Sequence, residues 1–532
     1  MYDLIIKQAM IIDGTGKPGW TGDVGIKNDK FTAIEPSLET ADTSETVDGK
    51  GLVIAPGFID IHTHSDDFWQ EDALSEIKLQ QGVTREILGN CGVSMAPMAP
   101  QSQDIVDFRD ALISLKKHKN FTNGFSFKDY KAFLEEKGLS NNVMGLIGHG
   151  TLRMAVMGFS DNIPDQNQME KMKTLMDEAM DQGALGVSTG LIYAPGIFAR
   201  TPELVELSRI VAKKGGFYAS HMRNEAEEIL ASIDEAVTIG KQAKIPVQIS
   251  HLKITGSRNW GLVDQVIEKL LNARKNGIDL TCDVYPYFSS STSLTALIPP
   301  WAIEGGVEHL IPRMHDAAQR QKIIHDIKYG IPDWEDMYHN AGWEKITISQ
   351  FNSVGKKEIE GRTVAQIARH KKTDPFELIL DLIEQEGDGV KIISETMNEK
   401  NVGTFLKLPF AMVGSDSHFS KGKPHPRLYG TFPRVIRRFV RELKILTLEE
   451  AIYKMTGLPA LRLKLKDAGL IKAGYKADAV LFNSETISDQ ATYQSPNNYP
   501  SGIARVIVNG KTVINDGVHT GAKPGKFDFL NR

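Results

Sequence analysis

Short apolar runs alternate with longer segments of helical spacing between Gly57 and Asp416. Each run is rich in Val, Ile and Leu and ends on polar or glycine residues. The segments between the runs repeat apolar residues three and four positions apart. This alternation predicts parallel strands joined by core-facing helices, an α/β fold. The runs are GFIDIHTH, GVTREILGN, NVMGLIGHG, GALGVSTGL, GFYASHMRN, IPVQISHLK, GIDLTCDVYPY and FAMVGSDSH. Eight such strands favour a closed TIM-like (β/α)8 barrel.

The stretch between the last two of these runs is much longer than one crossover helix. We expect an insertion at about 293–400, before the last barrel strand, that is mainly helical and has ITISQF as a candidate strand. Short strand-like runs separated by turn residues mark both chain ends, and Asn509-Gly510 is a hairpin signal. Since neither end can form a domain alone, residues 1–55 and 476–532 are expected to pair into one small β-sandwich around the barrel at 56–475.

Composition narrows the class of protein. The chain of 532 residues is 41% hydrophobic and 24% charged with a net charge of −5, so nothing in its charge favours nucleic acid as a partner. The first residues include Asp3 and no long apolar stretch, which predicts a cytoplasmic protein without a signal peptide or membrane anchor. Its two cysteines cannot form a disulfide framework. We expect Cys282, inside an apolar run, to pack in the core.

The ends of the predicted strands carry the candidate chemistry. In a barrel of this type, catalytic side chains come from the carboxyl ends of the strands. These ends hold imidazole, thiol and carboxylate groups, which are the side chains that bind zinc. They belong to His62, His64, Cys91, His221, His251 and Asp416. Any one histidine alone is more often a core or surface residue, but six such groups at one barrel mouth predict a metal centre. For His149, a direct role and a structural role both stay open.

Several motifs resemble a known family. GFIDIHTHSD, VQISHLK, GSDSH and the divided sandwich are similar to the amidohydrolase superfamily, whose barrels bind zinc and hydrolyse amide bonds. Many members carry a carboxylated lysine on the fourth strand, whereas ALGVSTGL has none. LGNCG, GHGTLR, ALGVSTGLIYAPG, YASHMRNE, DVYPYFSSST and HPRLYGTFPR resemble the D-aminoacylase branch, in which a cysteine from the second strand binds the metal instead. Cys91 matches that cysteine.

The resemblance implies a set of metal ligands and a reaction. A tightly bound zinc ion would be held by Cys91, His221 and His251, and a second, weakly or partly occupied site by His62, His64 and Asp416. The expected reaction is hydrolysis of N-acyl-D-amino acids to a carboxylate and a free D-amino acid. Metal-bound hydroxide is the expected nucleophile, and Asp416 is the expected general base and acid.

Substrate binding is implied in the same way. Arg427 matches the arginine that binds the substrate carboxylate in this branch, with Lys253, Tyr285 and Ser291 as helpers. Barrel packing is an alternative for Tyr285, and loop capping for Ser291. The loop GLIYAPGIFART either lines the side-chain pocket or is simply well packed. Arg153 and Arg223 either meet an acidic substrate or pair with nearby carboxylates.

Other functions stay open beside this one. A peptide that ends in a D-residue presents the same amide bond and the same terminal carboxylate. Cyclic amides are disfavoured because hydrolases of cyclic amides generally retain the fourth-strand lysine. A binding protein that has lost the chemistry is disfavoured because all six candidate ligands and Arg427 are present. The expected partner is a small molecule, and the sequence gives no indication of the oligomeric state.

Overall fold

A closed ring of parallel strands forms the central part of the fold. The computed structural model describes residues 1–39, 43–68, 72–98, 124–351, 358–420 and 422–530. Within these ranges the ring consists of β6 (Phe58–Asp60) with β7 (Thr63–His64), β8 (Val83–Leu88), β9 (Asn142–Gly145) with β10 (Ile147–Gly148), β11 (Gly186–Gly190), β12 (Phe217–His221), β13 (Val247–Ile249), β14 (Leu280–Val284), and β18 (Ala411–Val413) with β19 (Ser417–His418). Neighbouring strands pair in parallel, and β19 pairs with β7 to close the ring. The predicted barrel is confirmed.

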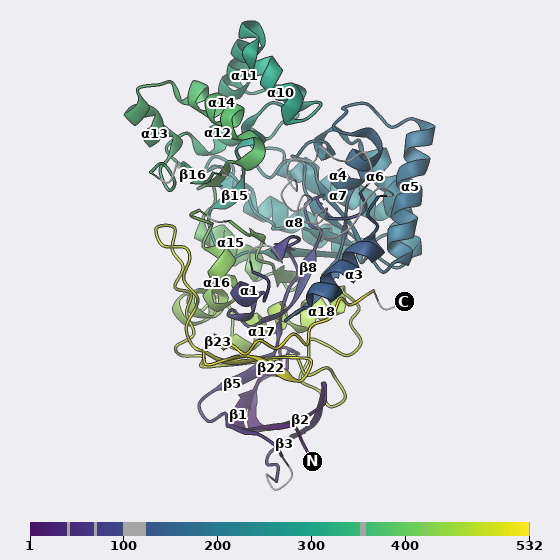
Figure 1. The fold of residues 1–532 in the computed structure, drawn as a ribbon, viewed down its shortest axis with the longest axis vertical. Helices are drawn as coiled ribbons and strands as arrows, with labels where there is room; N and C mark the ends of the chain where they lie inside the picture. Colours follow the sequence, from purple (N-terminus) through teal and green to yellow (C-terminus); the bar gives the residue numbers. More distant parts are fainter. Residues whose placement is uncertain (40–42, 69–71, 99–123, 352–357, 421, 531–532) are drawn as a thin grey trace.

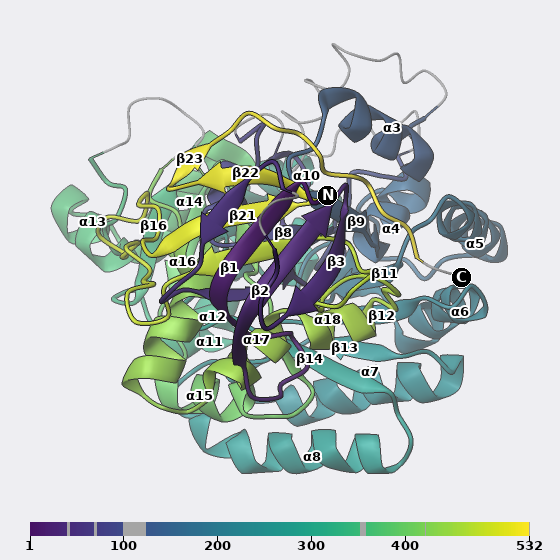
Figure 2. The same cartoon turned by 90° about the horizontal axis from the view of Figure 1, so that it is seen from below.

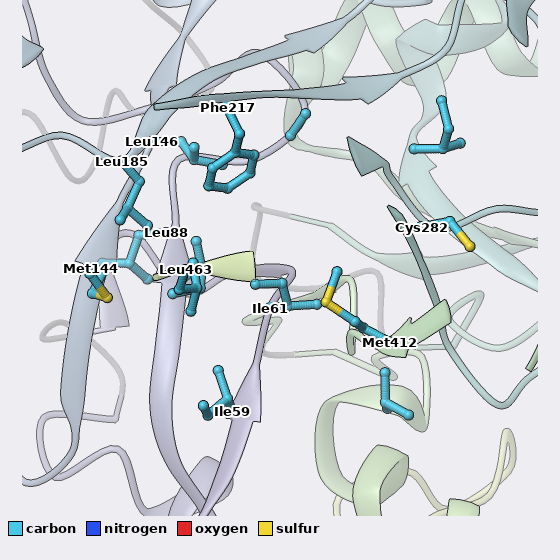
Figure 3. Close-up of a cluster of buried hydrophobic side chains, with 14 of the residues drawn as sticks. Ile59, Ile61, Leu88, Met144, Leu146, Leu185, Phe217, Cys282, Met412 and Leu463 are labelled. Atoms are coloured by element: carbon cyan, nitrogen blue, oxygen red, sulfur yellow. The ribbon is translucent and has the colours of Figure 1, made fainter. Parts of the chain in front are cut away.

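Apolar side chains from the strands fill the barrel. Side chains from β6, β8, β9, β12, β14 and β18 face one another (Figure 3), among them Leu88, Met144, Phe217 and Met412. Cys282 lies in this cluster and is fully buried. Burial raises the pKa of its thiol. The predicted packing role of Cys282 is therefore confirmed.

Helices cover the outside of the barrel. They are α1 (Glu76–Leu79), α3 (Phe127–Lys137), α4 (His149–Met157), α5 (Gln166–Asp181), α6 (Thr201–Lys213), α7 (Ile229–Ala243), α8 (Val263–Lys275), α15 (Glu399–Leu406), α16 (Arg427–Arg434) with a π-helical continuation at Val435–Glu442, α17 (Leu448–Met455) and α18 (Gly457–Arg462). In α5, Asp165 caps the first turn and Met172, Met176 and Met180 form the buried stripe that the sequence pattern predicts. None of the described helices is long and apolar enough to cross a membrane.

The insertion forms a separate subdomain beside the barrel (Figure 1). Its strands β15 (Ser290–Ser293), β17 (Lys391–Ser394) and β16 (Ile346–Gln350) form an antiparallel sheet in that order, so ITISQ is a strand as predicted. Its helices are α9 (Pro300–Ile303), α10 (Val307–His315), α11 (Ala317–Tyr329), α12 (Met337–Ala341), α13 (Val364–Lys371) and α14 (Pro375–Glu386). Leu310, Ile327, Ile348 and Ile379 belong to a core of its own.

Both chain ends contribute to one β-sheet (Figure 2). In the described part of the chain its order is β23 (Val518–His519), β22 (Lys511–Asn515), β21 (Ile503–Val508), β20 (Ala479–Phe482), β5 (Val53–Pro56), β1 (Leu4–Ile11), β2 (Trp20–Lys27) and β3 (Lys30–Glu35), with β4 (Thr46–Asp48) beside β1. β20 pairs with β5, which joins the two ends. The predicted hairpin at Asn509-Gly510 connects β21 and β22, and both residues have the positive φ that this turn needs. The outer strand β3 also meets the segment just before β20, where Lys30 forms an isolated antiparallel bridge with Lys476.

Candidate active site

The six predicted ligands lie at the carboxyl ends of the barrel strands. His221 ends β12, and Cys91, His251 and Asp416 follow β8, β13 and β18 by two or three residues. His62 lies in the bend before β7, and His64 ends β7. Five of these side chains line a cavity of about 250 Å³, and the sixth, His62, contacts Cys91. The arrangement follows from the barrel, because parallel strands present their carboxyl ends at one mouth.

Cys91 lies between the two groups of histidines. Its Sγ atom is 3.3 Å from Nε2 of His62 and 3.4 Å from Nε2 of His251. The Nε2 atom of His251 lies 2.9 Å from Nδ1 of His221. The thiol and the two imidazoles that the family resemblance implies for the tight metal site are thus linked through His251.

Asp416 faces the other two histidines. Its Oδ1 atom lies 3.2 Å from Nε2 of His64 and 3.5 Å from Nε2 of His62. One donor atom from each of His62, Cys91, His251 and Asp416 falls within 4.8 Å of the other three. The structure therefore brings all six predicted ligands into one cluster.

Three of these residues have strained backbones. Cys91, His251 and Asp416 have φ values of 50°, 36° and 50°, in the left-handed region that residues with a Cβ rarely adopt. Each of these conformations costs on the order of 1 kcal/mol or more and is characteristic of functional sites. The conformation turns the chain sharply after a strand, which directs the side chain into the barrel mouth.

The charged groups of the site shift one another's pKa values toward the ionised forms. Burial alone would raise the pKa of the Cys91 thiol, but nearby His62, His251 and His64 hold it well below its usual value. Burial alone would lower the pKa of His62, but the negative charges of Asp283 and Cys91 raise it well above the usual value. A thiolate among imidazoles is the donor set that zinc prefers. Since the donors converge on one point from separate strands, these residues fit a zinc ion.

Asp416 is ionised for a similar reason. Burial would raise its pKa, but the charges of Arg427 and His251 and a hydrogen bond from His64 hold it well below the usual range. Arg427 donates from Nη1 to Oδ2 of Asp416 at 2.7 Å and from Nη2 to the carbonyl of Ser291 at 3.3 Å.

The other three predicted substrate-binding residues, Lys253, Tyr285 and Ser291, lie near Arg427. Arg427, Lys253 and Ser291 line the cavity, and the guanidinium of Arg427 stacks over the ring of Tyr285 at 4.8 Å. Tyr285 is buried and packs in the core, with its hydroxyl 3.5 Å from Sδ of Met397. Ser291 lies in strand β15, so it does not cap a loop. Among the described residues, Nε of Arg427 and Oγ of Ser291 are buried without a hydrogen-bond partner.

Three acidic residues of the site were not predicted. Asp283 on β14 accepts a hydrogen bond from the backbone N–H of His251 and lies 3.1 Å from Nδ1 of His62. Glu225 lies 2.6 Å from Nζ of Lys253 and 3.0 Å from Nδ1 of His251. Glu335, from the insertion, accepts the backbone N–H of Glu225 at 2.5 Å. Of the three, only Glu225 could have been suspected from the sequence, because it lies four residues after the predicted ligand His221.

The structure also settles the open alternatives outside the cluster. His149 and Arg153 both bind Glu203, at 2.8 Å and 2.7 Å, and are buried by this network. Arg223 pairs with Glu235 at 2.9 Å. These contacts favour structural roles for all three residues. The loop after β11 lines the cavity through Ile192, Tyr193, Ala194, Pro195 and Gly196.

Comparison with known proteins identifies the family. The model of the amidohydrolase family matches residues 45–252 and 325–514, which is most of the chain. The chain belongs to the amidohydrolase family. This amidohydrolase is 33% identical to a D-aminoacylase of Alcaligenes xylosoxydans xylosoxydans, over 99% of its own length and 97% of that protein. It is 34% identical to an N-acyl-D-glutamate deacylase of the same organism, over 96% and 93% of the two lengths.

Solved structures agree with this assignment. A D-aminoacylase studied for the role of its binuclear metal centre matches with a TM-score of 0.84 and 31% identity over 100% of both chains. An N-acyl-D-glutamate deacylase from Bordetella bronchiseptica matches with a TM-score of 0.82 and 31% identity over 99% of both chains. That structure contains zinc and a phosphonate inhibitor that mimics the tetrahedral intermediate of the reaction.

Proposed function

We propose that this amidohydrolase removes the acyl group from N-acyl-D-amino acids with the help of bound zinc. The main support for this proposal is the contact between Arg427 and Asp416. It places the guanidinium of Arg427, which can bind a carboxylate, beside the metal-ligand cluster. Nε of Arg427 and Oγ of Ser291 are buried without partners among the described residues, in a cavity that these two residues line. Buried donors of this kind need an acceptor, and a substrate carboxylate supplies one.

Cys91, His221 and His251 would hold the tight zinc ion, and His62, His64 and Asp416 a weaker one. When bound, zinc supplies a Lewis acid for the acyl carbonyl and lowers the pKa of a water molecule. Asp416 would accept a proton from the attacking water and return it to the departing nitrogen. Because its pKa is held well below the usual range, Asp416 is in the ionised form that this role needs. The C–N bond breaks, a C–O bond forms, and the products are a carboxylate and an amino acid.

Arg427 orients the substrate by binding its α-carboxylate. Lys253 lies on the same cavity and is paired with Glu225 at 2.6 Å, so it adds positive charge with a fixed position. Anchoring the carboxylate fixes the distance from the scissile amide to Asp416. Because the reacting groups are then already in position, the entropic cost of reaching the transition state falls. Tyr285 supports Arg427 from below, and Ser291 supplies a second donor.

The D configuration of the substrate is supported by the relatives, three of which are named as deacylases of D-amino acids or as a D-aminoacylase. A dipeptide with a C-terminal D-residue would satisfy Arg427 equally and is the alternative substrate. We further propose that the protein works in the cytoplasm on small molecules, since a reducing compartment keeps the Cys91 thiol available for the metal.

The decisive experiment is amine release from paired N-acetyl-D- and N-acetyl-L-amino acids with the zinc-loaded protein. The panel spans Met, Leu, Phe, Glu and Asp. Turnover confined to the D series is the expected result and also ranks the side chains. Turnover of the L series at equal rates would contradict the proposed stereochemistry. Turnover of neither series, with L-Ala-D-Xaa dipeptides cleaved, would replace the substrate by the dipeptide.

A further inference from the structure

A buried lysine lies behind the metal-ligand cluster and has no part in the chemistry described so far. Lys78 is on the short helix α1, and 4% of its side chain is exposed. Its Nζ atom lies 2.6 Å from Oδ2 of Asp60 and 3.5 Å from Oε2 of Glu86. A charged ammonium in such a position is costly to bury unless its hydrogen bonds are satisfied.

Three hydroxyl groups next to the predicted ligands also surround the ammonium group of Lys78. The Nζ atom lies within hydrogen-bond distance, 2.9 Å, of each of these three hydroxyls, which belong to Thr63, Ser415 and Ser417. Thr63 lies between His62 and His64 in the sequence, and Ser415 and Ser417 lie on either side of Asp416. One ammonium group therefore binds the immediate neighbours of three predicted ligands.

These contacts cross the seam of the barrel. The first and last strands meet where β7 pairs with β19, and Thr63 and Ser417 are partners in this short pairing. Asp60 reinforces it, since its Oδ1 atom accepts the backbone N–H of Ser415 at 2.8 Å. The backbone N–H of Asp416 donates to the carbonyl of His62 at 2.8 Å. The relative position of Asp416 and the two histidines thus depends on the seam that Lys78 binds from behind.

We propose that Lys78 is a positioning residue that fixes Asp416, His62 and His64 for the reaction; this inference rests on the proposed function. The remaining ligands, Cys91, His221 and His251, come from other strands. Among the described residues, the hydroxyls that Lys78 binds belong to the sequence neighbours of His62, His64 and Asp416 instead. Loss of Lys78 should therefore disturb proton transfer and the weaker metal site while leaving the tight zinc site in place. A lysine that served only stability would affect all these properties together.

The test compares Lys78→Met with Lys454→Met. Lys454 on α17 is a matched control, because it is equally buried and its Nζ donates to the carbonyls of Leu408 and Ala411, at the opposite end of β18. For Lys78→Met we expect kcat to fall about 100-fold with KM nearly unchanged, as a displaced catalytic group causes. Lys454→Met should lower the melting temperature but leave kcat within about threefold of the wild type.

A zinc titration gives a readout independent of activity. Lys78→Met should keep the tight zinc ion and weaken the second one by about 10- to 100-fold, the usual cost of removing a group that orients a ligand. The inference is overturned if Lys78→Met and Lys454→Met give the same kcat, or if both zinc sites of Lys78→Met weaken equally. If wild type hydrolyses no substrate of the panel, the proposed function fails, and the zinc titration alone decides the role of Lys78.

A double variant covers the case in which Lys78→Met does not fold because Asp60 is left as an unpaired buried charge. Asp60→Asn combined with Lys78→Met removes both charges and should restore folding. The expected result is a folded protein that still has a low kcat and a weak second zinc site. Full activity in this folded double variant would overturn the inference.

Discussion

Arg427 and Asp416 form a buried ion pair, with Nη1 of the arginine 2.7 Å from Oδ2 of the carboxylate. The residue proposed to bind the substrate and the residue proposed to move its proton are therefore in direct contact. A substrate carboxylate that binds Nε of Arg427 is placed beside Asp416 by the same side chain. Recognition and catalysis are thus coupled through one guanidinium, and variants of the two residues should separate their roles.

Asp416→Asn should abolish proton transfer with little effect on the tight zinc site. Asparagine has nearly the same shape, but it cannot accept a proton from water at neutral pH. We expect kcat to fall by about 10²- to 10⁴-fold. Zinc content by atomic absorption should stay at one tight ion per chain. Loss of that ion together with activity would show that Asp416 acts chiefly as a ligand.

Arg427→Lys should impair substrates that carry a free carboxylate. Lysine keeps the charge but loses the planar fork of donors, so kcat/KM should fall about 10- to 100-fold. N-acetyl-D-amino acid amides, which lack the carboxylate, are the comparison. The wild type should hydrolyse these amides more slowly, and Arg427→Lys should lower their kcat/KM much less. An equal loss of kcat/KM on both kinds of substrate would mean that Arg427 acts mainly through Asp416.

Cys91→Ala should remove the tight zinc ion, whereas Cys282→Ala should not. Both thiols are buried, but only Cys91 contacts imidazoles, and their charges lower its pKa well below the usual value. We expect zinc affinity to fall by at least about 100-fold in Cys91→Ala, more than the loss of an orienting group costs. Cys282→Ala should lower stability while retaining the metal. Retention of tight zinc in Cys91→Ala would refute the proposed ligand set.

Sequence reasoning reached the barrel and the ligands because both follow from local pattern. The period of the apolar residues predicts strands, and the carboxyl end of each strand is visible in the sequence, so Cys91, His221 and His251 could be found one strand at a time. Asp416 and Arg427 needed the family resemblance for their roles. Their assignment as base and carboxylate ligand stays a prediction that the variants above test.

Residues that meet only through tertiary structure could not be predicted. Glu335 belongs to the insertion, and it lies 110 residues from Glu225, whose backbone N–H it accepts. Lys78 lies 337 residues from Ser415. No periodicity connects such pairs, because their contact depends on how the insertion docks and how the barrel closes. The three-stranded sheet of the insertion, seen in the described residues, was missed for the same reason.

Glu335 should make stability depend on pH. Burial and the charge of Glu225 raise the pKa of Glu335 from 4.5 to about 7. Between pH 4.5 and 7 the folded protein therefore holds a proton that the unfolded chain releases. In this range the Glu335 contribution lowers stability as pH rises, and above pH 7 its effect is constant. Glu335→Gln carries no titrating group and keeps an oxygen for the backbone N–H of Glu225.

The melting temperature of Glu335→Gln should consequently match that of wild type near pH 4.5 and exceed it near pH 8, the difference growing between these values. The gain at pH 8 is at most about 3 kcal/mol. Glu178→Gln, at an exposed position of α5, is the control and should change neither the melting temperature nor its slope with pH. A Glu335→Gln curve parallel to wild type would mean that Glu335 is ionised throughout, so that the cation of Lys253 outweighs burial and Glu225.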